Sequence, residues 1–118
     1  MLPELKRGIR TIADHYGLNI QTIKLAEECS EYASSYFKFI GYSHCESGLP
    51  AKDYFNEKKK LACTVNMREL ADVMIMTKQI EYLMNQPENY WLKDMIETYM
   101  SEKVERQLKR IEEENKSA

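Results

Sequence analysis

The sequence predicts an all-α fold, a four-helix bundle formed by one domain that covers residues 1–118. Glycine and proline are confined to a few places: all four glycines lie at or before residue 48, and the prolines are Pro3, Pro50 and Pro87. Long stretches before and after Pro87 therefore contain no helix breaker. No alternating run of β-branched residues indicates a strand. Apolar residues instead recur every three or four positions, as on amphipathic helices.

The first two helices are predicted from about Pro3 to Tyr16 and from about Ile20 to Ile40. Pro3 suits a first helical turn and Gly17 suits a helix end. Asn19 is a suitable cap for the second helix. The apolar stripe of the first helix consists of Leu2, Leu5, Ile9, Ile12 and Tyr16. The apolar arc of the second includes Leu25, Cys29, Tyr32, Ala33, Tyr36 and Ile40.

Two further helices follow a loop that is predicted from Gly41 to Lys52. Asp53 is a suitable cap for the third helix, which is expected to end near Asn85, ahead of a proline. The fourth helix is predicted from about Glu88 to Glu114, and a polar tail begins near residue 112. Its core positions are Leu92, Ile96, Met100, Val104, Leu108 and Ile111. Antiparallel packing in a bundle is the simplest arrangement for four such helices.

Charge and composition exclude several classes of protein. The formal net charge of −2 gives no basic footprint for a nucleic acid polymer or a membrane surface. No apolar run approaches the roughly 18 residues of a membrane span, and the N-terminus lacks the apolar region of a signal peptide. The cysteines are too few and too scattered for a disulfide framework, and His44-Cys45 lacks further metal ligands. We expect a soluble, cytoplasmic protein with reduced thiols at Cys29, Cys45 and Cys63.

Two carboxylates interrupt the apolar stripe of the third predicted helix. At 100° per residue, Glu69 lies near the centre of the apolar arc and Asp72 lies toward its edge. A buried carboxylate must be protonated, paired with a base or bound to a cation. Arg68, Lys78 or a lysine from another helix would supply an ion pair, so that alternative stays open. The full stripe is Ala62, Val65, Glu69, Asp72, Met76, Ile80 and Leu83, with Gln79 beside Ile80.

A matching polar strip lies on the second predicted helix. Glu28 and Glu31 are three residues apart, as are Glu69 and Asp72, so each pair points one way from its helix. If the two helices face each other, four carboxylates converge and repel unless a hard divalent cation binds them. Oxygen ligands favour Mg²⁺ or Mn²⁺ over zinc or copper. The strip consists of Gln21, Lys24, Glu28, Glu31 and Ser35.

Two details of this acidic pattern bear on its chemistry. A di-iron bundle needs a Glu-x-x-His motif on each of two helices. Neither His15 nor His44 follows a glutamate by three residues, so a di-iron site is disfavoured.

Glu27 points about 100° away from Glu28. It is either a solvated surface residue or the holder of a water molecule or a second ion.

The fourth predicted helix carries a basic face formed by Tyr99, Lys103, Arg106 and Arg110. Arginine suits phosphate oxygens, so this face is consistent with an anionic ligand. Cations also favour the C-terminal halves of helices without any ligand. Both interpretations stay open.

Two acidic motifs resemble those of the MazG-like family of all-α nucleotide pyrophosphohydrolases. The family pattern is Glu-Glu-x-x-Glu on one helix and Glu-x-x-Asp on the next, and this chain has EECSE at 27–31 and ELAD at 69–72. The flanking runs YGLNIQTIKLAEECSEY and RELADVMIM are similar to the family as well. The resemblance covers roughly residues 15–84 and, less closely, KVERQLKRI near the C-terminus.

The resemblance implies Mg²⁺-dependent hydrolysis of nucleoside triphosphates (NTP or dNTP) to the monophosphate and pyrophosphate, a housecleaning activity on the nucleotide pool. It implies a homodimer or homotetramer, and Glu27 or Glu31 as the residue that orients the attacking water. Mn²⁺ stays open as an alternative metal because oxygen ligands suit it too. The metal ligands that the resemblance implies are Glu28, Glu31, Glu69 and Asp72. The substrate contacts are Gln21, Lys24, Lys103, Arg106 and Arg110. Tyr16, Tyr36 and Trp91 are further candidates near the base, and a core position is the alternative for each of them.

The chain departs from the family pattern in two places. The gap between the acidic motifs is lengthened by residues 41–60, which include EKKK at 57–60 and would cover the base pocket or serve an interface. The downstream basic motif of the family is also not cleanly matched. Two alternatives therefore stay open: an enzyme like phosphoribosyl-ATP pyrophosphatase, and a non-catalytic helical interaction module whose acidic residues form interface salt bridges.

Overall fold

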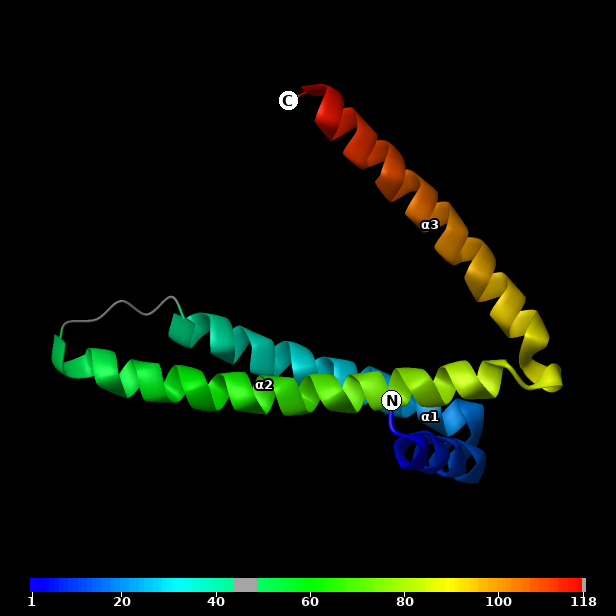
Figure 1. Cartoon of the computed structure of the whole chain (residues 1–118), viewed down its shortest axis with the longest axis horizontal. Coiled ribbons are helices and arrows are strands. Elements are labelled where there is room, and N and C mark those ends of the chain that lie inside the picture. The colour runs from blue at the N-terminus through cyan, green and yellow to red at the C-terminus, as the bar shows by residue number, and fades with distance from the viewer. Residues whose placement is uncertain (44–48, 118) are drawn as a thin grey trace. The chain divides into compact units, whose positions relative to one another are not determined.

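The structure is a computed structural model that describes the backbone of residues 1–43 and 49–117 and the side chains of residues 1–41 and 56–117. The described residues form helices and contain no strand, which confirms the all-α prediction. The elements are α1 (Pro3–Ser43), α2 (Leu49–Met84), the 3₁₀ turn η1 (Pro87–Asn89) and α3 (Tyr90–Ser117), as Figure 1 shows. Within the described ranges, none of these helices combines the length and the apolar character that crossing a membrane requires.

The helices fall into two compact units, Met1–Tyr82 and Leu83–Ala118. The first unit contains α1 and nearly all of α2. The second contains the end of α2, the turn η1 and α3.

Gly17 divides α1 into two helical segments. Its backbone has φ 80° and ψ 169°, a conformation that side chains with a Cβ rarely adopt. A Cβ at this position would meet no atom within 4 Å, so the backbone conformation and not crowding requires glycine. The predicted helix end at this residue therefore corresponds to a kink, and the helix resumes directly after it instead of at Ile20.

The predicted loop from Gly41 to Lys52 is wrong throughout the part that the structure describes, residues 41–43 and 49–52. The helix α1 continues through Ser43, and α2 already begins at Leu49, so Asp53 lies inside α2 and not at its cap. Pro50 explains the difference. In the first turn of a helix the missing N–H of proline costs no hydrogen bond, so this residue begins a helix instead of preventing one.

The first unit is held together by contacts between α1 and α2, which lie side by side in antiparallel directions (Figure 1). The segment of α1 before Gly17 contributes buried Ile9 and Ala13. The Tyr82 hydroxyl of α2 donates a hydrogen bond to Asp14 at 3.1 Å, and the Arg10 guanidinium lies 5.6 Å from the centre of the Tyr82 ring. Most of the predicted stripe of this segment is exposed, because only Ile9 of its five residues is buried.

The second unit begins with a tight turn between α2 and α3. Leu83 O, a carbonyl left without a helical partner at the end of α2, accepts bonds from Gln86 N at 3.1 Å and Asn89 Nδ2 at 2.8 Å. The α3 helix therefore begins at Tyr90, two residues later than predicted. It extends to Ser117 through the predicted polar tail. Exposed ion pairs one turn apart support that extension: Glu105 with Lys109 and Glu112 with Lys116, both at 3.7 Å.

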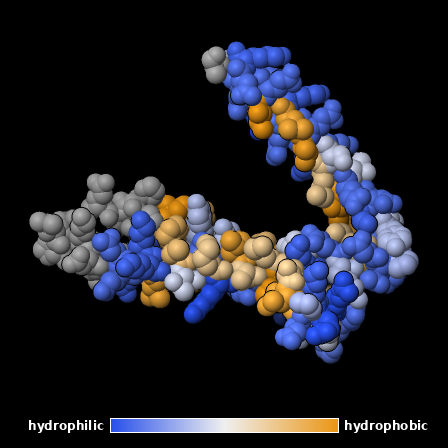
Figure 2. All heavy atoms as spheres, viewed as in Figure 1, coloured by the Kyte–Doolittle hydropathy of each residue, from blue (hydrophilic) through white to orange (hydrophobic). Residues whose placement is uncertain are grey.

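The apolar stripe of α3 is present but not covered. Every residue of α3 is described, and none of them is buried. The last four predicted core positions are Met100, Val104, Leu108 and Ile111, and each exposes more than half of its surface. Figure 2 shows apolar residues gathered along one side of α3 among polar ones.

Candidate metal centre

The interface between α1 and α2 carries a line of polar side chains, which we call the polar seam. It pairs residues whose numbers rise along α1 and fall along α2, as the antiparallel direction requires. Its members are Gln21, Glu28, Glu31 and Ser35 on α1 and Asn66, Glu69, Asp72 and Gln79 on α2. An interface between two helices is ordinarily apolar, so this composition calls for a chemical reason.

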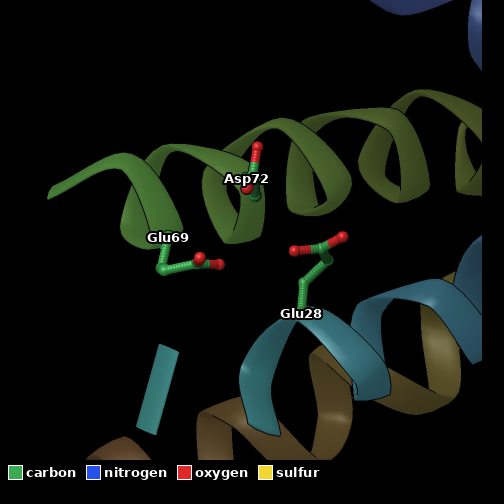
Figure 3. Close-up of side chains that lie close together, drawn as sticks. All are labelled: Glu28, Glu69 and Asp72. Carbon is green, nitrogen blue, oxygen red and sulfur yellow. The ribbon is translucent and has the colours of Figure 1, made fainter. Parts of the chain in front are cut away.

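Three carboxylates of the seam converge, and we call them the carboxylate cluster: Glu28 from α1 and Glu69 and Asp72 from α2. The oxygens that they would offer to one ion all lie within 4.8 Å of one another. Figure 3 shows Glu28 and Glu69 pointing toward each other across the gap between the helices, with Asp72 one turn further along α2. Glu28 and Glu69 are half-buried and Asp72 is exposed.

Glu31 borders the cluster, one turn beyond Glu28 on the same face of α1. Its carboxyl group is close enough to Glu28 and to Glu69 to accept a hydrogen bond from the protonated form of either one. Two carboxyl groups can share such a bond only when one of them keeps its proton. The predicted convergence of two acidic pairs on facing helices is therefore present in the geometry.

The pKa of Glu28 and the pKa of Glu69 are both raised above the ordinary glutamate value. Loss of hydration on burial is the largest cause for each. Repulsion from the negative charges of Glu31 and Asp72 raises both pKa values further, and a hydrogen bond accepted by Glu31 favours the protonated form of each glutamate. Both carboxyl groups therefore keep their protons up to a higher pH than an ordinary glutamate does.

Glu28 and Glu69 form no ion pair with any basic side chain that the structure describes, and Lys78 instead pairs with Glu81 at 3.5 Å. One oxygen of each, Oε2, is buried without a hydrogen-bond partner. Buried polar atoms without partners are uncommon and costly.

A hard divalent cation fits this donor set. Carboxylate oxygens are the protein ligands that Mg²⁺ and Mn²⁺ prefer, and opposite ligands of a Mg²⁺ ion lie about 4.2 Å apart, twice its bond length. The spread of 4.8 Å is close to that separation, so small side-chain movements would bring the oxygens into range. The unpartnered Oε2 atoms would gain the partner that they lack.

Amide and hydroxyl side chains continue the seam on both sides of the carboxylates. Ser35 and Asn66 are buried and joined at 3.0 Å, and Ser35 Oγ also lies 2.9 Å from the Tyr32 carbonyl. The Ser35 hydroxyl is the donor in both contacts, to Asn66 Oδ1 and to the Tyr32 carbonyl, so its one proton is shared between two acceptors. Sequence reasoning missed Asn66, although its position three residues before Glu69 on the same helix was a usable signal.

In the other direction, the same register places Gln21 level with Gln79. Their side chains expose only 1% and 2% of their surface. Gln21 Oε1, Gln21 Nε2 and Gln79 Oε1 are buried without hydrogen-bond partners. Gln21, predicted as a substrate contact, is therefore an interior residue of the first unit whose amide is free to bind.

The structure places the remaining predicted residues of the first unit at its surface. Glu27 is exposed and is not part of the carboxylate cluster. Lys24 is exposed, and its Nζ lies 5.9 Å from the centre of the Tyr16 ring. Tyr16 and Tyr36 are exposed as well.

The basic face predicted near the C-terminus belongs to the second unit. Lys103, Arg106 and Arg110 are exposed on α3, and Trp91 is exposed near its start. Of the thiols, Cys29 and Cys63 are free. Cys45 and the neighbouring His44 lie outside the described residues.

Comparisons with protein-family models, with curated proteins and with solved structures found no match to this chain.

Proposed function

We propose that this chain is a Mg²⁺-dependent nucleotide pyrophosphohydrolase that converts nucleoside triphosphates to the monophosphate and pyrophosphate. One observation carries the proposal: the two acidic motifs, which are far apart in the sequence, converge across the polar seam with buried oxygens that lack partners. This is the geometry that a cation-dependent reaction on a polyphosphate needs. A structural ion pair would have supplied a base, and none pairs with Glu28 or Glu69 among the described residues.

Each acidic residue has a defined role in this proposal. Glu28, Glu69 and Asp72 would hold the cation, with Glu31 beside them. When bound, the cation would neutralise phosphate charge and stabilise the charge that develops in the transition state. The water oxygen forms a bond to the α-phosphorus, the bond between that phosphorus and the bridging oxygen breaks, and pyrophosphate leaves with the bridging oxygen.

Glu31 is a better candidate than Glu27 for the residue that orients the attacking water. The Glu31 carboxyl group lies within hydrogen-bonding reach of two members of the acidic site, whereas Glu27 is exposed and stands apart from the cluster. In this role Glu31 would accept the proton of the attacking water. Glu31→Gln should then abolish turnover, whereas Glu27→Gln should reduce it little.

We also propose that the chain functions as a homodimer or homotetramer whose helices complete a four-helix bundle. The first unit buries few large apolar residues and exposes many, among them Ile23, Phe37 and Leu61. The apolar stripe of α3 is exposed too. Apolar surface on this scale is typical of protein interfaces. Light scattering coupled to size-exclusion chromatography would measure the mass of the assembly.

The test of the proposed activity is a panel of nucleotides incubated with the purified protein and Mg²⁺. Release of pyrophosphate from at least one NTP or dNTP is expected, and a chelator should stop it. Glu69→Gln removes one ligand oxygen's charge and should lower turnover by more than about 100-fold, since even indirect disturbance of metal sites costs 10- to 100-fold. Glu57→Gln, at an exposed position of the same helix, is the matched control and should leave turnover unchanged.

The panel should include phosphoribosyl-ATP, because an enzyme that acts on this substrate would use the same acidic site. Absence of turnover with every compound would favour the non-catalytic helical module instead. The exposed apolar residues of α3 are the observation that supports that second candidate.

A further inference from the structure

The central part of α3, residues 97–112, carries an exposed apolar stripe with an open groove beside it. Met100, Val104, Leu108 and Ile111 fall within an arc of about 80° at 100° per residue, and each exposes more than half of its surface (Figure 2). The groove has a volume of about 580 Å³ and is lined by Glu97, Met100, Ser101, Val104, Glu105 and Leu108. Apolar surface of this kind is typical of a face that a partner covers.

The charged residues beside this stripe are separated by sign. The basic flank consists of Lys103, Arg106 and Arg110, and the acidic flank consists of Glu97, Glu105 and Glu112. On the helical wheel the basic flank lies about 60–120° to one side of Met100, and the acidic flank lies about 60–140° to the other side. Over residues 97–112 the basic flank contains no acid and the acidic flank contains no base. All six charged residues are exposed.

The charges of the acidic flank are available to a partner. Glu105 and Glu112 each contact a lysine of their own helix at 3.7 Å, but all four side chains are about 70% exposed. Exposed ion pairs of this kind contribute little stability, so they exchange readily for contacts with another chain.

This separation of charge distinguishes two ways in which two copies of α3 can pack stripe against stripe. In a parallel pair each flank faces the opposite flank of the other copy, as the e and g positions do in a parallel coiled coil. In an antiparallel pair with two-fold symmetry each flank faces its own equivalent, so acids would meet acids and bases would meet bases. Parallel packing therefore brings opposite charges together along both edges of the stripe.

We propose that α3 docks in parallel against α3 of a second copy of this chain, with the apolar stripes in contact and the basic flank of each copy against the acidic flank of the other. The inference rests on the homo-oligomer proposed above, and it names the helix, the orientation and the residues of the interface. It also gives the basic flank a role that requires no phosphate ligand.

The direct test is disulfide formation between copies of the full chain, measured separately in Met100→Cys and in Ile111→Cys. In a parallel pair every stripe residue lies beside its own counterpart, so each variant should form a covalent dimer under mild oxidation. The two positions are about 16 Å apart along the helix, whereas a disulfide needs Cα atoms within about 7 Å. An antiparallel or crossed pair can therefore link at one of these positions at most. Mass spectrometry of the linked peptides distinguishes these bridges from those of native Cys29 and Cys63.

The matched control is Glu102→Cys, which places a thiol on the face of α3 opposite the stripe. It should give no more covalent dimer than the wild type treated in the same way. Linkage at only one of the two stripe positions would overturn the parallel orientation, and linkage at Glu102→Cys equal to that at the stripe would overturn the interface. A chain that stays monomeric and links at neither stripe position would show that the stripe packs elsewhere.

The second test reverses the charge of one flank. The double substitution Arg106→Glu and Arg110→Glu makes both flanks largely acidic, so contacts along both edges become repulsive. The Kd of the dimer, measured by light scattering over a range of protein concentrations, should rise about tenfold or more. Adding Glu105→Arg and Glu112→Arg exchanges the charges of the two flanks at these positions and should restore most of the affinity. An unchanged Kd, or no recovery on exchange, would contradict the proposal.

Lys109→Glu and Lys116→Glu together are the control for this second test. They make the same change in charge on the opposite face of the same helix, and they also remove the two exposed ion pairs. Their Kd should match that of the wild type, and circular dichroism should show equal helix content in all variants. An equal rise in this control would overturn the proposal, because the effect would then be one of general charge.

These measurements use no nucleotide, so they separate the pairing from the proposed activity. If no nucleotide is hydrolysed but both stripe variants link, the activity fails and the pairing stands. If pyrophosphate is released by a chain whose stripe variants do not link, the activity stands and this inference fails.

Discussion

The polar seam of the first unit and the apolar stripe of α3 contrast in both composition and burial. Where α1 meets α2, half-buried Glu28 and Glu69 and buried amides lie between the helices. On α3 the apolar residues recur at helical spacing, yet none is buried. One unit places polar groups where helices usually pack apolar ones, and the other leaves apolar groups exposed.

This difference shows that an apolar stripe and a polar seam constrain the structure in different ways. An apolar stripe specifies only that something will cover it, because the hydrophobic effect has no direction. A polar seam is costly to bury, so its residues persist only where hydrogen bonds, protons or a ligand satisfy them. The seam is therefore the part of the molecule where side-chain identity matters most. The following changes test that contrast, in order of decreasing expected effect.

Asn66→Asp should be the most destabilising of these changes. It replaces a buried amide, 3% exposed, with a carboxylate of the same shape beside an acidic cluster. An uncompensated buried charge costs about 3 kcal/mol or more in free energy of unfolding. Urea denaturation in EDTA would measure the loss, and mild acid should restore part of it by protonating the introduced carboxylate. Asn19→Asp, at an exposed position of α1, should have little effect.

Mg²⁺ or Mn²⁺ should stabilise the folded chain by an amount that approaches that loss. A ligand that binds only the folded state adds about 2.7 kcal/mol at 100 times its Kd. Thermal denaturation with increasing metal would show this as a rise in Tm. The rise should be largely lost in Glu69→Gln and kept in Glu57→Gln. An unchanged Tm of the wild type at millimolar metal would contradict a cation site in the cluster.

Without metal, the cluster should make the protein less stable as the pH rises. The pKa values of Glu28 and Glu69 are raised in the folded state, so between the ordinary and the raised pKa the folded chain binds more protons than the unfolded one. The contribution of these two groups to the free energy of unfolding is then fully present at low pH, and it is lost as the pH rises through the raised pKa. The stability of Glu69→Gln relative to wild type in EDTA should therefore increase from pH 4 to pH 7. A difference that does not vary with pH would show that Glu69 is not perturbed.

Leu108→Gln on α3 should have the smallest effect. Leu108 exposes 61% of its surface, and glutamine is a good helix former, so the change in free energy of unfolding should lie within about 0.5 kcal/mol. Chemical denaturation at protein concentrations low enough to keep the chain monomeric measures this. A cost above about 2 kcal/mol that grows with protein concentration would show that a second copy covers the stripe.

Most of the fold follows from local sequence patterns. Helical periodicity predicts the helices, and Gly17 and Pro87 mark where they break, because these residues act through their own backbone. Pro50 misleads the prediction because the same proline both prevents a helix interior and suits a helix start. The two pairs of acids are identifiable because carboxylates interrupt an apolar stripe, and their convergence needs only the assumption that two helices face each other.

Other parts of the site could not be read from the sequence alone. Asn66, Gln79 and Ser35 look like ordinary polar residues until the pairing of α1 with α2 shows that they are buried. Glu27 and Glu31 are equivalent candidates until the fold places Glu31 within hydrogen-bonding reach of the cluster.

The sequence by itself determined that the chain is helical, where its helices bend, and which carboxylates share a helical face, because these properties depend on residues within a few turns of one another. The tertiary structure alone decided which polar groups are buried and which glutamate lies beside the cluster. Those properties depend on the register between α1 and α2, and register is set by packing over the whole interface.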